Sequence, residues 1–246
     1  LLDASEWLEA ELLEGVAKRQ LFGERHSSYH FTKSLAEGVF AADHAPLPLA
    51  IVRPSIIGAA WREPTPGWVD NYNGLSGFLV AAGKGVLRTL HARPDAVCDV
   101  IPVDFVVNTC LASAAAVAVR RPADAPLVVN CVSGQTNPIT WRQIRDFSAP
   151  LLLRWPSSEL FRFPGVSLHS SAFLHYCHLL AEHRIPAVFV DLLFRACGLQ
   201  PILGKVYQKV NKSVAALEYF TCNEWRFRVE QWRHLSDSQS AADRHD

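Results

Sequence analysis

A helix that runs directly into a short buried strand constrains the fold of this chain more than any other feature. The sequence predicts a helix over residues 28–42, which carries Tyr29 and Lys33 four positions apart. The apolar run 47–52 follows it and stops at Arg53-Pro54, as a buried parallel strand does. Parallel strands need helical crossovers between them, so this order predicts an α/β fold.

Tyr29 and Lys33 are a phenol and an ammonium, a pair that could act as a proton donor. Side chains four apart on a helix share one face. A neighbouring cation favours phenolate and lowers the pKa of a phenol, which could then protonate a carbonyl oxygen as negative charge develops there. The lysine could also hydrogen-bond the ribose of a nicotinamide cofactor. The alternative is an ordinary surface helix, with Lys33 solvated or ion-paired to Glu37.

A helix bearing Tyr-x-x-x-Lys and then such a strand is the order seen in short-chain dehydrogenase/reductase folds. In that fold the carboxyl end of the strand faces the cofactor crevice. Pro54, Ser55 and Ile57 would then lie beside the nicotinamide, where backbone groups could hold its carboxamide. The alternative for Arg53-Pro54 is a simple strand terminator.

The α/β pattern continues to about residue 148. A long loop is predicted over residues 61–74, because this stretch is rich in proline, glycine, tryptophan and asparagine. A strand near 99–103 leads into a helix that ends near 119, and another buried strand covers 127–132. Thr140 is expected to cap the following helix.

Beyond residue 148 the composition changes. Residues 149–170 hold several prolines and glycines and are predicted to be a linker. Residues 171–199 are predicted to form two helices broken at Pro186, with Gly198 as the C-terminal cap. A further amphipathic helix is predicted over residues 205–222.

Charge and cysteine content argue against several classes of function. The 24 basic and 24 acidic residues balance, so nothing indicates a nucleic-acid partner. None of the six cysteines forms a Cys-x-x-Cys pair, so no metal site is expected. No apolar run reaches the ~18 residues of a membrane span. The chain contains no methionine and opens without a signal peptide, which predicts a fragment of a longer protein.

Seven stretches carry a family resemblance: residues 29–37, 51–59, 66–71, 81–85, 101–104, 130–134 and 217–221. Through them the chain resembles the alcohol-forming fatty acyl-CoA reductases of animals, over nearly its whole length to about Leu235. The Pro-Gly-Trp loop at residues 66–68 and the Leu-Glu-Tyr-Phe-Thr ending at 217–221 are more specific than Tyr-x-x-x-Lys alone.

The resemblance implies a partial extended short-chain dehydrogenase/reductase (Rossmann-type) domain over residues 1–148, the linker 149–170, and a helical C-terminal domain over 171–246. It implies NADPH as cofactor and long-chain fatty acyl-CoA as substrate, reduced to a fatty alcohol through a bound aldehyde with Tyr29 as proton donor. For the longer protein it also implies association with the peroxisomal membrane.

Two alternatives to that reductase remain. The glycine-rich phosphate loop and the active-site serine of the family have no counterpart in this sequence, so the chain could be a catalytically inactive fragment. In that case residues 1–246 alone are expected not to bind NADPH tightly, because the dinucleotide pyrophosphate normally rests on the first Rossmann helix. The other alternative is an extended reductase that acts on sterols or nucleotide sugars.

Overall fold

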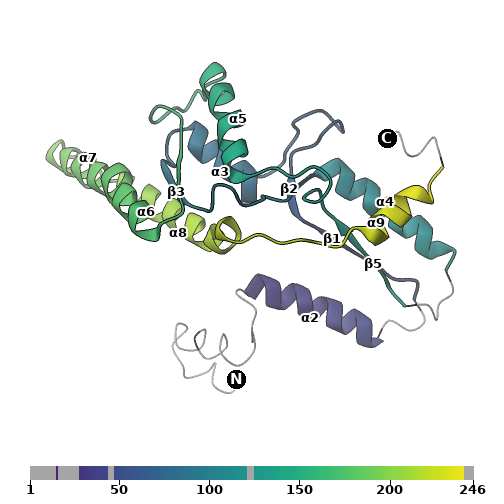
Figure 1. Cartoon of the computed structure of the whole chain (residues 1–246). Helices are drawn as coiled ribbons and strands as arrows, with labels where there is room; N and C mark the ends of the chain where they lie inside the picture. Colours follow the sequence, from purple (N-terminus) through teal and green to yellow (C-terminus); the bar gives the residue numbers. More distant parts are fainter. Residues whose placement is uncertain (1–14, 16–27, 44–46, 121–124, 241–246) are drawn as a thin grey trace. The chain divides into compact units, whose positions relative to one another are not determined.

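The computed structural model describes residues 15, 28–43, 47–120 and 125–240 (Figure 1). Contacts divide the chain into two compact units. One unit holds Leu1–Ile51 with Ser113–Val128, and the other holds Val52–Ala112 with Val129–Asp246. Helices and strands are interspersed through the described residues as far as β6, which confirms the predicted mixture of α and β structure.

The elements follow the predicted order closely. The described helices are α2 (Ser28–Asp43), α3 (Gly74–Gly83), α4 (Val103–Ala118), α5 (Trp141–Arg154), α6 (Ala172–Leu179), α7 (Ile185–Ala196), α8 (Leu203–Cys222) and α9 (Glu230–Asp237), with a π-helical turn η2 (Leu180–Arg184). The described strands are β1 (Ala50–Pro54), β2 (Ile56–Gly58), β3 (Thr89–His91), β4 (Val100–Pro102), β5 (Leu127–Cys131) and β6 (Ser167–His169). The strand predicted at 47–52 begins later than expected, because Pro48 has no N–H to donate to a strand ladder.

The described strands form three pairs, β1–β5, β2–β4 and β3–β6. The second and third pairs are parallel. In the first pair, the N–H of Leu127 donates to the carbonyl of Leu49 (2.9 Å) and the N–H of Ser55 donates to that of Cys131 (3.1 Å). Both strands therefore run in the same direction, as the sequence predicts for buried strands of an α/β fold.

β1 and β2 are separated by a single residue, Ser55, at which the pairing partner changes. The N–H of Ser55 bonds to the end of β5, whereas the next N–H, that of Ile56, donates to the carbonyl of Asp99 just before β4 (3.1 Å). The chain therefore leaves β5 and joins β4 at this residue. In α/β sheets, ligands bind in the crevice that forms where neighbouring parallel strands diverge.

An apolar core in the second unit packs α3 and α5 against β3. Its buried members are Phe78, Leu87, Leu90, Ala92, Ala96, Cys98, Trp141 and Ile144. The predicted cap of α5 is confirmed: the Thr140 hydroxyl accepts from the N–H of Gln143 (3.2 Å), and the Gln143 side chain accepts from the N–H of Thr140 (2.8 Å). This reciprocal pair satisfies two donors at the helix start.

Residues 149–170 contain more regular structure than a linker. α5 continues through Pro150 to Arg154, and β6 pairs with β3. The N–H of Phe161 also donates to the carbonyl of Lys84 (2.9 Å). Pairing with residues distant in sequence thus orders a stretch whose composition favours irregular structure. The predicted domain boundaries at residues 148 and 171 stay predictions.

The helical segment of residues 171–199 is not broken at Pro186, contrary to the sequence prediction. α6, η2 and α7 follow one another without a gap (Figure 1). The π-helical turn changes the hydrogen-bond register just before the proline, which then occupies the first turn of α7, where its missing N–H is tolerated. The predicted cap is confirmed, because Gly198 adopts a φ of +75° after the end of α7.

Candidate functional site

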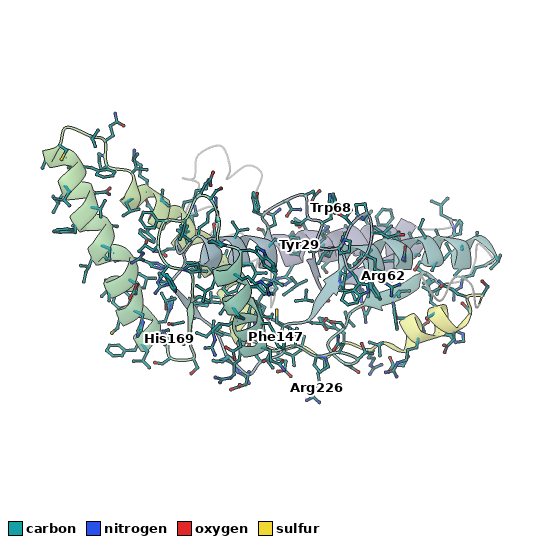
Figure 2. All side chains as sticks on the ribbon, turned by 90° about the horizontal axis from the view of Figure 1, so that it is seen from above. Tyr29, Arg62, Trp68, Phe147, His169 and Arg226 are labelled. Atoms are coloured by element: carbon teal, nitrogen blue, oxygen red, sulfur yellow. The ribbon has the colours of Figure 1, made fainter. Side chains whose placement is uncertain are left out.

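Tyr29 and Lys33 lie together at the start of α2. The Lys33 Nζ is 5.7 Å from the centroid of the Tyr29 ring, a cation–π arrangement. Tyr29 is 63 % exposed, and its backbone carbonyl accepts from the Thr32 hydroxyl (3.0 Å). Figure 2 labels Tyr29 on its helix. The predicted juxtaposition is confirmed and leaves the phenol accessible to a ligand, while the catalytic role of the pair stays a prediction.

Pro54, Ser55 and Ile57 surround the point where β1 is succeeded by β2. The Ser55 Oγ is buried and has no hydrogen-bond partner among the described residues. Pro54 and Ile57 are exposed on either side of it. A buried hydroxyl without a partner is costly, so such a group in a native fold calls for a ligand or water. The predicted contact between the backbone of this turn and a carboxamide stays a prediction.

The two sets of predicted site residues belong to different units. Tyr29 and Lys33 lie in the first unit, and Pro54, Ser55 and Ile57 lie in the second. Each set is therefore placed within its own unit. A single site formed by all five residues stays a prediction.

Asp104, at the start of α4, organises the loop between β2 and α3. Its carboxylate accepts from the backbone N–H groups of Trp61 (3.0 Å), Arg62 (2.8 Å) and Glu63 (3.2 Å). Burial alone would raise the pKa of Asp104, but these hydrogen bonds outweigh it and hold the pKa below its usual range. In the sequence, Asp104 is only an aspartate near the start of a predicted helix. That position does not indicate that its carboxylate binds the backbone of residues 61–63.

The anchored loop is ordered and presents aromatic side chains. The N–H of Ala60 donates to the carbonyl of Trp68 (3.0 Å), and the N–H of Gly67 returns a bond to the carbonyl of Ala60 (2.9 Å). Gly67 has a φ of +82°, which favours glycine at this turn. Trp61 and Trp68 are exposed, and Figure 2 labels Trp68 and the neighbouring Arg62. The long loop predicted over residues 61–74 is therefore ordered between residues 60 and 68 and exposes two tryptophan side chains.

A second group of titratable side chains surrounds a small cavity between β3, α6 and α8. His91 Nδ1 lies 2.7 Å from the carboxylate of Glu218, and the Thr89 hydroxyl lies 3.0 Å from His175 Nδ1. Burial, followed by the proximity of His91, lowers the pKa of His175. At about 70 Å³ the cavity has room for a few waters and not for a nicotinamide or an acyl chain.

No described helix is long and apolar enough to cross a membrane. Among the residues that the structure describes, no group of three or more histidine, cysteine, aspartate or glutamate side chains is arranged to hold a metal ion.

Comparison with known proteins gives two family matches along the chain. An NAD-binding family model described as male sterility protein matches residues 5–110, and a second model with the same description matches residues 182–246. The first match supports the predicted Rossmann-type class for the first part of the chain and implies a nicotinamide cofactor. The predicted helical character of a separate C-terminal domain stays a prediction.

Relatives resemble the chain over almost all of its length. Fatty acyl-CoA reductase 1 of Xenopus laevis is 41 % identical over 244 residues, which are 99 % of this chain and 47 % of the relative. The human fatty acyl-CoA reductase 1 is 40 % identical over the same lengths. Fatty acyl-CoA reductase 2 of Mus musculus is 37 % identical over 243 residues, again 99 % and 47 %. The chain thus spans about half the length of these relatives.

Proposed function

Because the chain belongs to the family of the fatty acyl-CoA reductases, we propose that its protein reduces a long-chain fatty acyl-CoA to a fatty alcohol with NADPH. The observation that carries this proposal is the cationic Lys33 against the exposed Tyr29 ring, 5.7 Å from its centroid, in a chain similar to these reductases almost end to end. The names of the relatives supply the substrate class. NADPH, the aldehyde intermediate and the role of Tyr29 are parts of the proposal.

In the proposed reaction Tyr29 is the proton donor in both reductions. NADPH supplies a hydride in each of them when it is bound. As the thioester carbon is reduced, Tyr29 protonates the carbonyl oxygen and a thiohemiacetal forms. The Tyr29 phenolate takes back the hydroxyl proton as the thiohemiacetal collapses, which breaks the carbon–sulfur bond, leaves an aldehyde and restores the phenol. The departing CoA thiolate takes its proton from solvent. Tyr29 then protonates the aldehyde oxygen in the second reduction, which gives the alcohol.

Lys33 and Ser55 are proposed to hold the cofactor. The Lys33 ammonium, which lies over the Tyr29 ring, would hydrogen-bond the ribose. Backbone groups of the turn at Ser55 would hold the nicotinamide carboxamide, as the sequence predicts. Pro54 and Ile57 would border the nicotinamide.

The test is the substitution Tyr29→Phe in the full-length protein. Loss of a general acid typically slows a reaction by ~10²–10⁴-fold, and one phenol serves both steps, so alcohol and aldehyde should both disappear from the products. NADPH consumption with palmitoyl-CoA and product identification by mass spectrometry measure this, with NADH as the cofactor control. Tyr176→Phe, on exposed α6, is the matched control and should keep activity.

Two results would contradict the proposal. Near-normal alcohol output from Tyr29→Phe would remove Tyr29 from the mechanism. A folded wild-type protein that forms neither aldehyde nor alcohol from any long-chain acyl-CoA would favour the catalytically inactive alternative.

A further inference from the structure

A cavity of about 280 Å³ lies in the second unit between α7 and α8, beneath two loop residues. All of its lining side chains are apolar: Val86, Phe161, Val190, Phe194, Ile202, Leu203 and Val206. It is larger than the histidine-lined cavity of about 70 Å³ and differs from it in polarity. The chemistry of its walls matches hydrocarbon and offers nothing to a charged or hydrogen-bonding ligand.

The side of the cavity formed by α7 and α8 is held in place by Asp191. This carboxylate on α7 accepts from the backbone N–H groups of Ile202 (3.1 Å), Leu203 (2.9 Å) and Gly204 (2.8 Å) at the start of α8. The three hydrogen bonds satisfy donors that a helix start leaves unpaired. They connect α7 to the first turn of α8, so the two helices hold their spacing around the cavity.

The opposite side of the cavity is fixed by a close backbone crossing. The N–H of Phe161 donates to the carbonyl of Lys84 (2.9 Å). At the adjacent Gly85, with a φ of +67°, a Cβ would lie 2.1 Å from the carbonyl of Arg162, so the two segments approach this closely only with glycine there. The Phe161 ring also meets the Tyr207 ring edge-on, with centroids 6.5 Å apart. The cavity is therefore a built feature of the fold.

α7 is apolar on the side that lines the cavity and on the side that faces solvent. Val190 and Phe194 point into the cavity. The exposed apolar residues of the same helix are Ile185, Val188, Phe189, Leu192 and Leu193, each at least half exposed. Figure 2 shows side chains around the whole helix.

The cavity is open to solvent on one side, because Phe161, Ile202 and Val206 in its lining are 46 %, 57 % and 38 % exposed. An open apolar depression favours an apolar occupant, since removing apolar surface from water is favourable. Water gains no hydrogen bonds from these walls, whereas each methylene that enters gains about fourfold in affinity, which corresponds to about 0.8 kcal/mol. The cavity is thus suited to hydrocarbon.

We propose that this cavity binds the methyl-terminal part of the substrate's hydrocarbon chain and thereby sets the preferred chain length. The proposal rests on the proposed function, which supplies a long-chain acyl group as the ligand. It assigns to the α7–α8 region a binding role that is separate from the Tyr29–Lys33 pair.

The test measures fatty-acid binding without cofactor or turnover. Decanoate, myristate, palmitate and stearate are titrated into the full-length protein by calorimetry. Val190→Trp places an indole inside the cavity and should weaken stearate binding by roughly tenfold or more, while decanoate binding changes little, since each excluded methylene costs about fourfold. Val188→Trp is the matched control: it lies two residues away on the exposed side of α7 and should leave the series unchanged.

A second variant, Phe194→Ala, enlarges the cavity and should shift the preference toward stearate over palmitate. Circular dichroism checks that Phe194→Ala folds. If Val190→Trp does not fold, the affinities of Phe194→Ala decide the test. An unchanged affinity series in the folded variants would overturn the cavity assignment.

The two proposals fail separately. If the wild type forms alcohol but the cavity variants bind every acid as the wild type does, the cavity assignment is wrong and the proposed function stands. If the wild type binds stearate through the cavity and reduces no acyl-CoA, the proposed function is wrong and the hydrocarbon site stands.

Discussion

Asp104 shows how one residue can order a long loop. Its carboxylate gathers the N–H groups of Trp61, Arg62 and Glu63, which lie 43, 42 and 41 positions away in sequence. Three such donors converge on it because the chain turns away from β2 and has no strand or helix to pair with there. Backbone groups without partners would otherwise be costly wherever water is excluded.

We predict that Asp104→Ala destabilises the protein by about 1–3 kcal/mol, because it leaves several N–H groups without their acceptor. The folded-state pKa of Asp104 is depressed, so its contribution is present above the unfolded pKa near ~4 and is lost as pH falls through the lower folded value. Urea unfolding of wild type and variant at pH 7 and in acid measures both effects.

Asp104→Asn is the control for the role of charge at this site. It keeps one acceptor oxygen and removes the titration, so its stability at pH 7 should fall between those of wild type and Asp104→Ala. Equal acid sensitivity in the wild type and both variants would show that Asp104 does not contribute in this way.

The pair Tyr29 and Lys33 required only local information. Helix geometry brings residues four apart onto one face wherever the helix forms, and α2 forms where the sequence predicts it. The unpartnered hydroxyl of Ser55 is different. Its burial depends on β4 and β5, which lie tens of residues further along the chain, so no spacing rule could reveal it.

The first residue of α5 can be predicted from the sequence alone. Thr140 and Gln143 are three residues apart and form a capping box in the structure. We predict that Thr140→Ala lowers the free energy of unfolding by about 1 kcal/mol, because one N–H at the helix start loses its acceptor. Thr140→Ser keeps the hydroxyl and should stay within a few tenths of the wild type. Equal losses for both substitutions in thermal unfolding would argue against the cap.

The ends of other elements depended on contacts that are distant in sequence. Pro186 predicts a break by its chemistry, yet the π-helical turn before it accommodates the missing N–H. Residues 149–170 contain prolines and glycines that favour a linker, yet the segment at 84–91 supplies backbone partners that order part of the stretch. In both places the surrounding structure overrides the local preference of the sequence.

At the scale of the whole molecule, His183 joins three segments of the second unit. It is fully buried, and its Nε2 accepts from the backbone N–H of Arg88 (3.1 Å). That nitrogen therefore carries no proton, so Nδ1 bears the hydrogen and donates to the Asn211 side chain (3.1 Å). Burial is the largest reason that the pKa of His183 is lowered. The neutral ring connects η2 with α8 and with the residue before β3.

We predict that the free energy of unfolding falls as pH drops below ~6.5, the usual pKa of an unfolded histidine. Because the folded pKa is depressed, the stabilising contribution of His183 is complete above that value and is lost as pH falls toward and through the folded pKa. His169 and His175 have lowered pKa values and add loss of the same sign. Urea unfolding between pH 8 and pH 5 measures the slope.

His183→Gln should be less stable than the wild type at pH 8 and should show a shallower loss toward pH 5. His234→Gln, at an exposed position in α9, is the matched control and should follow the wild type. An identical slope for His183→Gln and wild type would mean that protonation of His183 does not limit stability in acid.

The sequence by itself determined the features that arise within a few residues: the helix with Tyr29 and Lys33 on one face, the apolar strands, the Thr140 cap and the glycine at the end of α7. These follow from helix and strand geometry, which any sufficiently regular segment obeys. Tertiary structure alone decided the partners of Asp104, the unpartnered Ser55 hydroxyl, the environment of His183 and the hydrocarbon-sized cavity between α7 and α8. Each of these depends on which atoms a folded chain brings together and hides from water, and those atoms belong to segments tens of residues apart.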